Sequence, residues 1–334
     1  MYNNLTVIGF ISSYTKSLDA ILAIAIISIL PLIILFPPSA SSQRSLLLSS
    51  QPINNDIVSS NSTNINSSVI TPINSTAIKV DKFGIKEIYP TKVGGREWYV
   101  NIANPQNDSI FFITSPSDQN ITKQIDGNNN TIWRVSYPKV RMHATTPPGS
   151  ALWKNVEITG YVRVDSIISN KDSNNTDIAW LARSGRHNDE VPCDGTALIG
   201  GIHDDGTVGW KKEIWFTGGY TKELAQSKPI QSIVGRWIGW KVIMYNINNN
   251  TAVKMQSYLD DKNNNHWTKV TDILDDGGWF ADATDSEFYS ANCGRAKDHI
   301  ITNGGPNVTF RSDNLVMDFK NLSVREIQAS NSLS

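Results

Sequence analysis

From Ile78 onward the chain is a succession of short segments in which apolar and polar residues alternate, separated by turn residues. Lys154–Val164, KNVEITGYVRV, and Trp237–Tyr245 both place apolar side chains at every second position, which is typical of half-buried strands. Val253–Asp260 and His266–Ile273 follow across Asn-rich turns. Strands of this kind without a long amphipathic helix predict an all-β fold, a two-sheet β-sandwich.

Two segments depart from simple alternation. Lys222–Ser227 is a modest helix candidate, cut short by a proline two residues later. Within Leu315–Ile327, Met317 and Phe319 are odd-numbered, whereas Leu322 and Val324 are even-numbered. One extra residue near Lys320–Asn321 explains this change of phase, so we expect a bulged strand there.

The N-terminal part of the chain has a different composition. Ala20–Phe36 contains seventeen residues without a charge, interrupted by Pro31 and followed by small residues up to Ala40. Both a cleaved signal peptide and an uncleaved membrane anchor fit this pattern, and its length favours the anchor. The expected organisation is a short polar segment at 1–19, a hydrophobic helix at 20–36, a tether at 37–77, the β-sandwich at 78–328 and a flexible tail at 329–334.

The segment 37–77 is dominated by Ser, Asn, Gln and Thr. Its apolar surface is too small to offset the entropy of ordering, so we expect a disordered tether. N-glycosylation sequons begin within it and continue along the chain, in agreement with an extracellular location, on the cell membrane or secreted. They start at Asn61, Asn66, Asn74, Asn107, Asn120, Asn129, Asn174, Asn249, Asn307 and Asn321.

Composition excludes one class of partner and favours another. The net charge is −1, whereas a nucleic-acid-binding protein needs a basic stripe. The ten Trp residues offer flat faces on which sugar rings stack. Cys193 and Cys293 predict one disulfide in an exported protein, closing a loop of about 100 residues. A thiolate nucleophile or a metal ligand is the alternative, and the absence of a CxxC spacing disfavours a metal.

The stretch Trp180–Tyr220 holds the clearest hairpin. Asp205-Gly206 is the type of pair that forms a two-residue turn, which predicts that Gly201 faces Trp210 and Ile199 faces Lys212. In this prediction one face carries His203, Trp210 and Lys212, and the other carries Leu198, Ile202, Lys211, Glu213 and Trp215. Neither face is purely apolar, which favours the wall of a cleft over a simple half-buried hairpin with salt-bridged charges.

Three segments resemble the concanavalin A-like jelly roll shared by laminin-G modules, glucanases and several polysaccharide lyases. They are WKNVEITGYVRV, RWIGWKVIMYN followed by VKMQSYLDD, and FRSDNLVMDFKNLSVREI, and the resemblance covers about residues 79–328. It implies a sheet whose concave face holds a sugar chain. The glucanase E-x-D-x-E signature and the lyase R-x-E-x-R strand are absent. Ile202-His203 is similar to the Gln-Ile-His strand of the lyases, with Gly201 in place of Gln, which leaves His203 as a possible catalytic base.

A lyase acting on a uronic-acid polymer needs a group that neutralises the sugar carboxylate, a base and an acid. Lys212 is a candidate neutraliser, His203 a candidate base and Tyr220 a candidate acid. Arg186 is the alternative neutraliser, His187 the alternative base and Tyr245 the alternative acid.

A glycoside hydrolase needs two carboxyl groups instead. Glu213 is one candidate, and Asp194, beside Cys193, is a possible partner. A salt bridge to Lys211 or Lys212 is the structural alternative for Glu213. Ser184 has no nucleophile-elbow context, which excludes a serine hydrolase.

Asp261, Asn263 and Asn265 have a D-x-N-x-N spacing that suits Ca²⁺. The Gly and the terminal Glu of an EF-hand loop are missing, so a polar hairpin turn is the preferred interpretation, and the chain is expected to need no cofactor.

The interpretation that we favour is a carbohydrate-binding domain without catalysis. Trp210, Trp215 and Tyr220 would stack on sugar rings, while Arg186, His187 and Lys212 would bind polar groups. Most of the Trp residues must belong to the core instead, and strand context selects four of them: Trp153, Trp180, Trp237 and Trp240. An acid–base pair in register would distinguish an enzyme from this binding domain.

Overall fold

The computed structural model describes residues 78–115, 121–168, 177–185, 192–216, 219–281 and 293–329. The hydrophobic segment 20–36 and the tether 37–77 lie outside these residues. In the part of the chain that is described, no helix is long and apolar enough to cross a membrane.

The described residues form fourteen strands and three short 3-10 helices. The first strands are β1 (Glu97–Tyr99), β2 (Phe111–Ser115), β3 (Ile121–Ile125), β4 (Thr131–Thr145), β5 (Val156–Ile167), β6 (Asp177–Ser184) and β7 (Thr196–His203). The others are β8 (Val208–Ile214), β9 (Gly219–Tyr220), β10 (Leu224–Ser227), β11 (Trp237–Ile247), β12 (Ala252–Asp260), β13 (Thr268–Asp275) and β14 (Asn307–Glu326). The 3-10 helices are η1 (Pro105–Asn107), η3 (Pro192–Asp194) and η4 (Asn248–Asn250).

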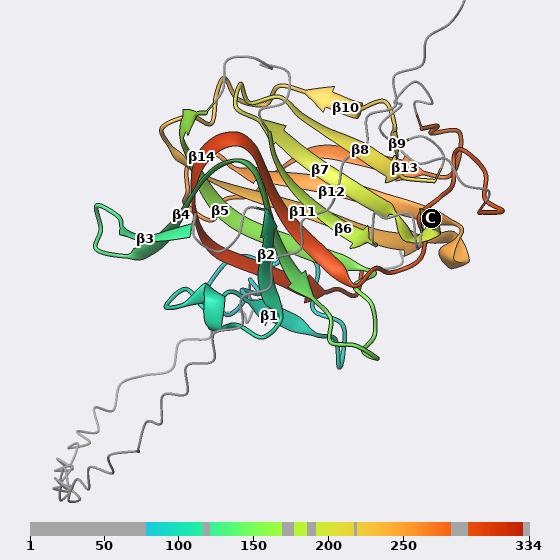
Figure 1. Cartoon of the computed structure of the whole chain (residues 1–334), viewed down its shortest axis with the longest axis horizontal. Coiled ribbons are helices and arrows are strands. Elements are labelled where there is room, and N and C mark those ends of the chain that lie inside the picture. The colour runs from blue at the N-terminus through green and yellow to red at the C-terminus, as the bar shows by residue number, and fades with distance from the viewer. Residues whose placement is uncertain are drawn as a thin grey trace, which may run out of the picture. The chain divides into compact units, whose positions relative to one another are not determined.

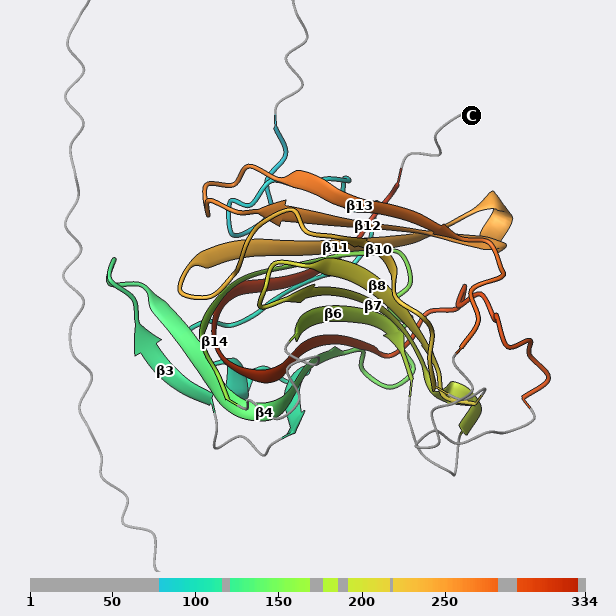
Figure 2. The same cartoon turned by 90° about the horizontal axis from the view of Figure 1, so that it is seen from above.

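The strands pair antiparallel in one curled arrangement whose main order is β10-β8-β7-β6-β14-β5-β11-β12-β13. Its two halves lie on each other as two layers (Figures 1 and 2). The front sheet contains β2, β6–β10, the first half of β14 and the part of β4 that pairs with it. The back sheet contains β5, β11, β12, β13 and the second half of β14. The predicted all-β sandwich is confirmed.

Strand β14 passes from one layer to the other. Residues 307–313 pair with β6 of the front sheet, and residues 315–326 pair with β5 of the back sheet. Asn314, between them, has a φ of 55°, in the left-handed region that Asn tolerates better than most residues. The register slips again between Lys320 and Ser323, where Asn321 has a φ of 54°. The bulge predicted from the change of apolar phase is therefore confirmed.

Indole N–H groups in the core donate hydrogen bonds from one layer to the other. Trp180 of β6 donates to the backbone oxygen of Trp240 at 3.0 Å, and Trp240 of β11 donates to that of Gly200 at 3.3 Å. Trp210 of β8 donates to Thr271 Oγ1 of β13 at 2.8 Å. A Cβ at Gly200 would lie only 2.6 Å from a methyl group of Val242, so a residue without a side chain is required there. Each large ring is thus buried with its polar group bonded.

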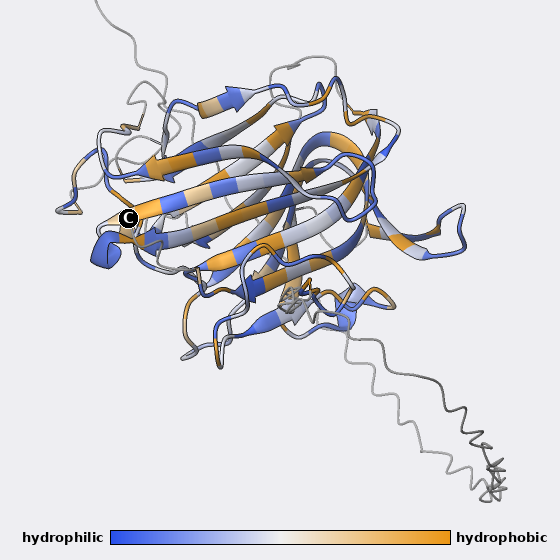
Figure 3. Ribbon diagram, turned by 180° about the vertical axis from the view of Figure 1, so that it is seen from behind, coloured by the Kyte–Doolittle hydropathy of each residue, from blue (hydrophilic) through white to orange (hydrophobic). Residues whose placement is uncertain are grey.

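Trp153, Trp180 and Trp240 are fully buried, as predicted. The fourth predicted core residue, Trp237, is not: it is half-buried on the outer face of the back sheet, between Arg163 and Lys320. Its partner across the strand pair is Arg163, at a position where side chains point away from the core. The alternation of apolar and polar positions along the strands is visible from behind in Figure 3.

The β7–β8 hairpin has a three-residue loop, which corrects the predicted two-residue turn. His203 N donates to Thr207 O at 2.8 Å, and Gly206 N donates to His203 O at 2.9 Å. Gly206 has a φ of 87°, as expected of a type I turn that ends in a left-handed residue. The carboxylate of Asp205 accepts a hydrogen bond from Thr207 N, which holds the longer loop.

The extra loop residue shifts the register by one. Gly200 faces Trp210, Ile199 faces Lys211 and Ala197 faces Glu213. A shift of one residue exchanges faces, because side chains alternate along a strand. His203 therefore shares the outer face with Lys211 and Glu213, while Trp210 and Lys212 point into the core.

The structure also decides the predicted helix at Lys222–Ser227 and the predicted disulfide. The helix expected at Lys222–Ser227 is wrong, because Leu224–Ser227 forms β10 along the edge of β8, with Ala225 at a φ of 54°. The Cys193–Cys293 disulfide is confirmed; it closes a loop of 100 residues. In the chain-entropy model such a loop stabilises the fold by roughly 4–5 kcal/mol.

Lys212 provides a test of this register. Its Nζ lies 2.9 Å from Asp275 Oδ2, and both side chains are fully buried. Burial lowers the pKa of Lys212 and raises that of Asp275, and their mutual attraction offsets this only in part. We predict that Lys212→Met lowers the free energy of unfolding by about 3–5 kcal/mol, because a buried carboxylate loses its partner.

Denaturant unfolding measures this effect. Adding Asp275→Asn to Lys212→Met should restore most of the loss. Lys211→Met, at the neighbouring and partly exposed position, should cost less than about 1 kcal/mol. Equal stability of Lys212→Met and Lys211→Met would contradict the core position of Lys212.

Candidate functional site

A hollow of about 520 Å³ lies on the outer face of the front sheet, the face turned away from the back sheet. We call it the outer hollow. Strands β2, β4, β6, β8, β9 and β14 contribute to it, so it draws on residues far apart in the sequence. Its lining residues are Phe112, Thr114, Arg141, His143, Leu181, Ser184, Gly185, Glu213, Tyr220, Asn307, Thr309 and Arg311.

One side of the outer hollow is formed by an aromatic pair. Phe112, whose side chain is 41% exposed, stacks on His143 with ring centroids 4.8 Å apart. The two ring nitrogens of His143 lie 2.9 Å from the hydroxyl oxygens of Thr114 and Thr309. Burial, and next the charge of Arg141, lower the pKa of His143 to about 4. The imidazole is therefore neutral at pH 7, and its two hydroxyl partners hold the ring in place.

Two arginines form another side and share one carboxylate. Arg141 of β4 and Arg311 of β14 are direct partners across the strand pair. Arg141 Nη1 lies 2.6 Å from Asp313 Oδ1, and Arg311 Nε lies 2.6 Å from Asp313 Oδ2. Burial raises the pKa of Asp313, but Arg311 and Arg141 outweigh this and hold it below its usual value. The carboxylate thus stays ionised and fixes both guanidinium groups.

Glu213 and Tyr220 complete the outer hollow as direct partners on β8 and β9. Glu213 is only 3% exposed. Burial raises the pKa of Glu213 to about 7, although Arg311 and Arg141 pull it down. Burial, and next Glu213, raise the pKa of Tyr220 to about 12, so its phenol keeps the proton. A hydrogen bond from Tyr220 to Glu213 lowers the pKa of the carboxyl group, and the pair lies beside two guanidinium groups.

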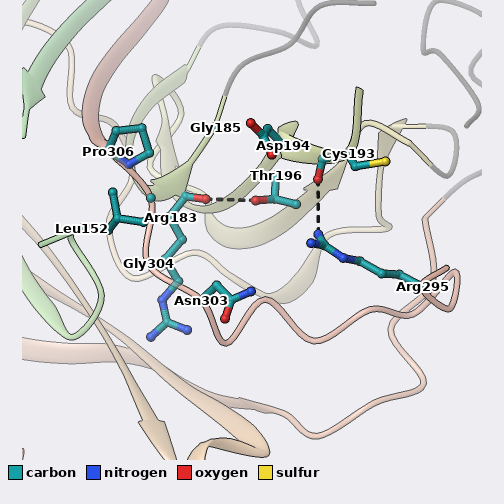
Figure 4. Close-up of a pocket in the computed structure, with 11 residues that line it drawn as sticks. Leu152, Arg183, Gly185, Cys193, Asp194, Thr196, Arg295, Asn303, Gly304 and Pro306 are labelled. Carbon is teal, nitrogen blue, oxygen red and sulfur yellow. Dashed lines mark hydrogen bonds between the residues drawn. The ribbon is translucent and has the colours of Figure 1, made fainter. Parts of the chain in front are cut away.

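A second hollow of about 340 Å³, the disulfide hollow, adjoins the first at Gly185 (Figure 4). Arg295 Nη1 donates to the backbone oxygen of Cys193 at 3.2 Å, and Thr196 Oγ1 donates to that of Arg183 at 3.1 Å. Asp194 lines this hollow and Glu213 lines the outer hollow. The structure therefore does not bring the two carboxyl groups of the proposed hydrolase pair into one hollow.

The register corrects the roles expected for two residues of the hairpin. Trp210 is fully buried with its indole bonded to Thr271, so it offers no face to a sugar. Lys212 is fully buried against Asp275 and cannot neutralise a substrate carboxylate. Trp215 is half-buried, and Gly195 packs against its side chain. Of the residues predicted to stack on sugars, Tyr220 is the one that lines the outer hollow.

His203 lies elsewhere on the outer face, beside Glu223. Its Nε2 is 3.6 Å from Glu223 Oε1. The interaction with Glu223 raises the pKa of His203, and nearby Asp177 adds to the effect. A catalytic base must be neutral to take a proton. Because its surroundings favour the charged imidazolium and it does not line the outer hollow, His203 is poorly placed for the role that the sequence suggested.

Other candidates lie outside the described residues or on another face. Arg186 and His187 belong to a segment that is not described. Tyr245 is on the outer face of the back sheet, where its hydroxyl contacts that of Tyr89 at 3.3 Å.

The loop with the D-x-N-x-N spacing forms a hairpin turn between β12 and β13. Asp260 accepts hydrogen bonds from Asn264 N at 3.1 Å and Asn265 N at 2.7 Å. Asn265 Oδ1 accepts from Lys86 N at 2.8 Å. The oxygen that calcium would need from Asn265 is therefore already bonded within the protein. Among the described residues no group of three or more His, Cys, Asp and Glu could hold a metal ion.

Sequence reasoning missed the β4 and β14 side of the outer hollow. Arg141 and His143 are two residues apart, as are Thr309, Arg311 and Asp313. Such spacing puts polar residues on one face of each strand. The signal was present, but only the pairing of β4 with β14 shows that these faces coincide.

No protein-family model matches the sequence, and no curated protein matches it. Among solved structures, basic winged bean lectin with Tn-antigen is similar with a TM-score of 0.40 and 9% identity, over 69% of this chain and 97% of that one. The exoplasmic/lumenal domain of VIP36 in its Ca²⁺/Man-bound form has a TM-score of 0.38 and 9% identity, over 70% and 89%. A protein of unknown function with a galectin-like fold from Bacillus subtilis has a TM-score of 0.35 and 10% identity, over 70% and 100%. Similarity of this degree identifies neither a ligand nor a site residue.

Glu213 gives the outer hollow a pH dependence that can be measured. Its pKa of about 7 in the folded chain lies above the usual 4.5, so the folded chain holds a proton that the unfolded chain releases between these values. The contribution of Glu213 to stability therefore falls as pH rises from about 4.5 to 7. We predict that Glu213→Gln gains about 2–3 kcal/mol relative to the unsubstituted chain between pH 5 and pH 8.

Urea unfolding at the two pH values checks this. Glu97→Gln, at an exposed strand position, is the control and should show no such gain. A Glu213→Gln difference that does not change with pH would show that the carboxyl titrates normally.

Proposed function

We propose that the chain is a carbohydrate-binding protein and that it binds glycan in the outer hollow. The observation that carries the proposal is the combination of an exposed aromatic ring with converging polar groups in one cavity. Phe112, stacked on His143, is 41% exposed, while Arg141 and Arg311 present N–H donors and Tyr220 lines the same cavity. A sugar ring has an apolar C–H face and a rim of hydroxyl groups, and it needs both kinds of contact.

The polar groups of the outer hollow are held in position before a ligand arrives. Asp313 fixes both guanidinium groups, and Thr114 and Thr309 fix the imidazole of His143. Fixed side chains lose little conformational entropy when they bind a ligand. This supports recognition by side chains that the strands of the sheet hold in place.

We infer that the protein is exported and tethered to the outer face of the cell membrane, or secreted if the segment 20–36 is cleaved. The uncharged run in that segment and the tether composition of 37–77 support this. The Cys193–Cys293 disulfide adds support, because disulfides persist in oxidising compartments. Protease added to intact cells should remove the β-sandwich, and full protection would contradict export.

A second candidate function is cleavage of the bound polysaccharide by a lyase or a glycoside hydrolase mechanism. Glu213 favours it, because a carboxyl with a pKa near 7 suits proton transfer at neutral pH. Tyr220 is its neighbour in the same hollow. New reducing ends with a new C=C absorbance would indicate a lyase, and reducing ends alone a hydrolase.

Binding is tested with the whole chain in mild detergent, by affinity electrophoresis through gels that contain individual polysaccharides. We predict retardation by at least one polysaccharide, weakened about three- to tenfold by Phe112→Ala because a stacking surface is lost. Phe280→Ala removes another exposed ring, 56% exposed and outside the outer hollow, and should leave retardation unchanged. Equal effects of the two substitutions would place the site elsewhere, and no retardation by any polysaccharide would refute the proposed function.

A further inference from the structure

The charged groups that line the outer hollow are predominantly positive. Among the residues that the structure describes, these are two guanidinium groups, Arg141 and Arg311, and one carboxyl group, Glu213. His143, also in the lining, is neutral at pH 7 because burial lowers its pKa. Asp313 does not line the hollow, and its side chain is 4% exposed. A ligand in the hollow therefore meets more positive than negative charge.

The accessible cation is Arg141. Its side chain is 24% exposed, compared with 11% for Arg311. Its bonds to Val140 O, Ser312 O and Asp313 use Nη1 and Nη2, and no bond of Nε is among them. A guanidinium has five N–H donors in a planar fork, so one edge of Arg141 can bind a ligand while the other stays on Asp313.

The acids near the two arginines do not cancel this charge. Asp313 is one carboxylate shared by two guanidinium groups. Asp177 Oδ1 lies 3.8 Å from Arg311 Nε. Asp177 is on β6 and Arg141 is on β4, so they lie on opposite sides of β14. Burial raises the pKa of Asp177. Glu213 lies near Arg311, Arg141 and Tyr220, and burial raises its pKa to about 7, so the carboxyl group is only partly ionised at neutral pH.

This deepens the proposed glycan-binding function and rests on it: we propose that the outer hollow selects a sugar that carries a carboxylate, bound by the guanidinium of Arg141 with Arg311 behind it. A carboxylate is planar with two oxygens, which matches the fork of a guanidinium in a bidentate pair. The sugar ring then stacks on Phe112, and its hydroxyl groups reach Glu213 and Tyr220. A neutral sugar leaves the exposed edge of Arg141 without an anionic partner.

The test compares polymers that differ only in charge. The whole chain, in mild detergent, is titrated with polygalacturonate and with the same polymer after complete methyl esterification, at equal ionic strength. We expect at least tenfold tighter binding to polygalacturonate. A dextran sulfate of equal charge density is the third arm, and we expect it to bind more weakly than polygalacturonate.

Two substitutions with opposite expected signs separate recognition from misfolding. Arg141→Gln should weaken polygalacturonate binding at least tenfold and change binding of the methyl ester less than threefold. Asp313→Asn keeps a side-chain oxygen that can accept from a guanidinium group but removes the competing negative charge, and should tighten polygalacturonate binding about threefold or more. Arg236→Gln, at an exposed position outside the hollow, should change neither.

The outcomes distinguish the inference from the function on which it rests. Equal affinity for polygalacturonate and its methyl ester overturns carboxylate selection and leaves glycan binding standing. Dextran sulfate binding as tightly as polygalacturonate overturns the assignment to a carboxylate. Weakening by Asp313→Asn as large as that by Arg141→Gln also overturns it. Binding to no polysaccharide at all, neutral ones included, refutes the proposed function itself.

Discussion

The structure depends on the indole rings that cross between its two layers. Trp180 and Trp240 each donate to a backbone oxygen of the opposite sheet, and Trp210 donates to Thr271. A buried indole costs free energy unless its N–H is bonded, so these contacts fix how the sheets lie against each other. Gly160 and Gly200 leave the space that the rings and Val242 occupy. Because alternate residues of a strand face opposite ways, fixing the core face also fixes which side chains reach the outer face.

Strand β14 then brings the distant parts of the site together. Its first half lies between β4 and β6 in the front sheet, and its second half crosses to the back sheet at Asn314. This places Arg311 beside Arg141 on one face, with Asp313 two residues further along to hold both. The same strand that closes the fold therefore supplies one wall of the outer hollow. The carbohydrate binding that we propose there would use side chains that the fold has already positioned.

Local patterns predicted the strands, the bulge at Asn321 and the disulfide, because each depends on neighbouring residues or on a pair of cysteines. The face of the hairpin was not predictable from its turn residues. Asp205-Gly206 fits both a two-residue turn and the end of a three-residue turn, and the difference of one residue moves Lys212 from the surface to the core. The side of the outer hollow formed by Arg141 and Arg311 was missed for another reason. These residues of β4 and β14 are about 170 residues apart, and alternation within a strand does not reveal which strand pairs with it. Glu213 and Tyr220 were identified because they lie on the hairpin itself.

The central claim is that glycan binds on the outer face of the front sheet. The most direct measurement is a crystal structure of the chain with a short acidic oligosaccharide. The account predicts a sugar ring against Phe112, with its carboxylate on Arg141. An oligosaccharide on the outer face of the back sheet, stacked at Trp237 with the outer hollow empty, would contradict it.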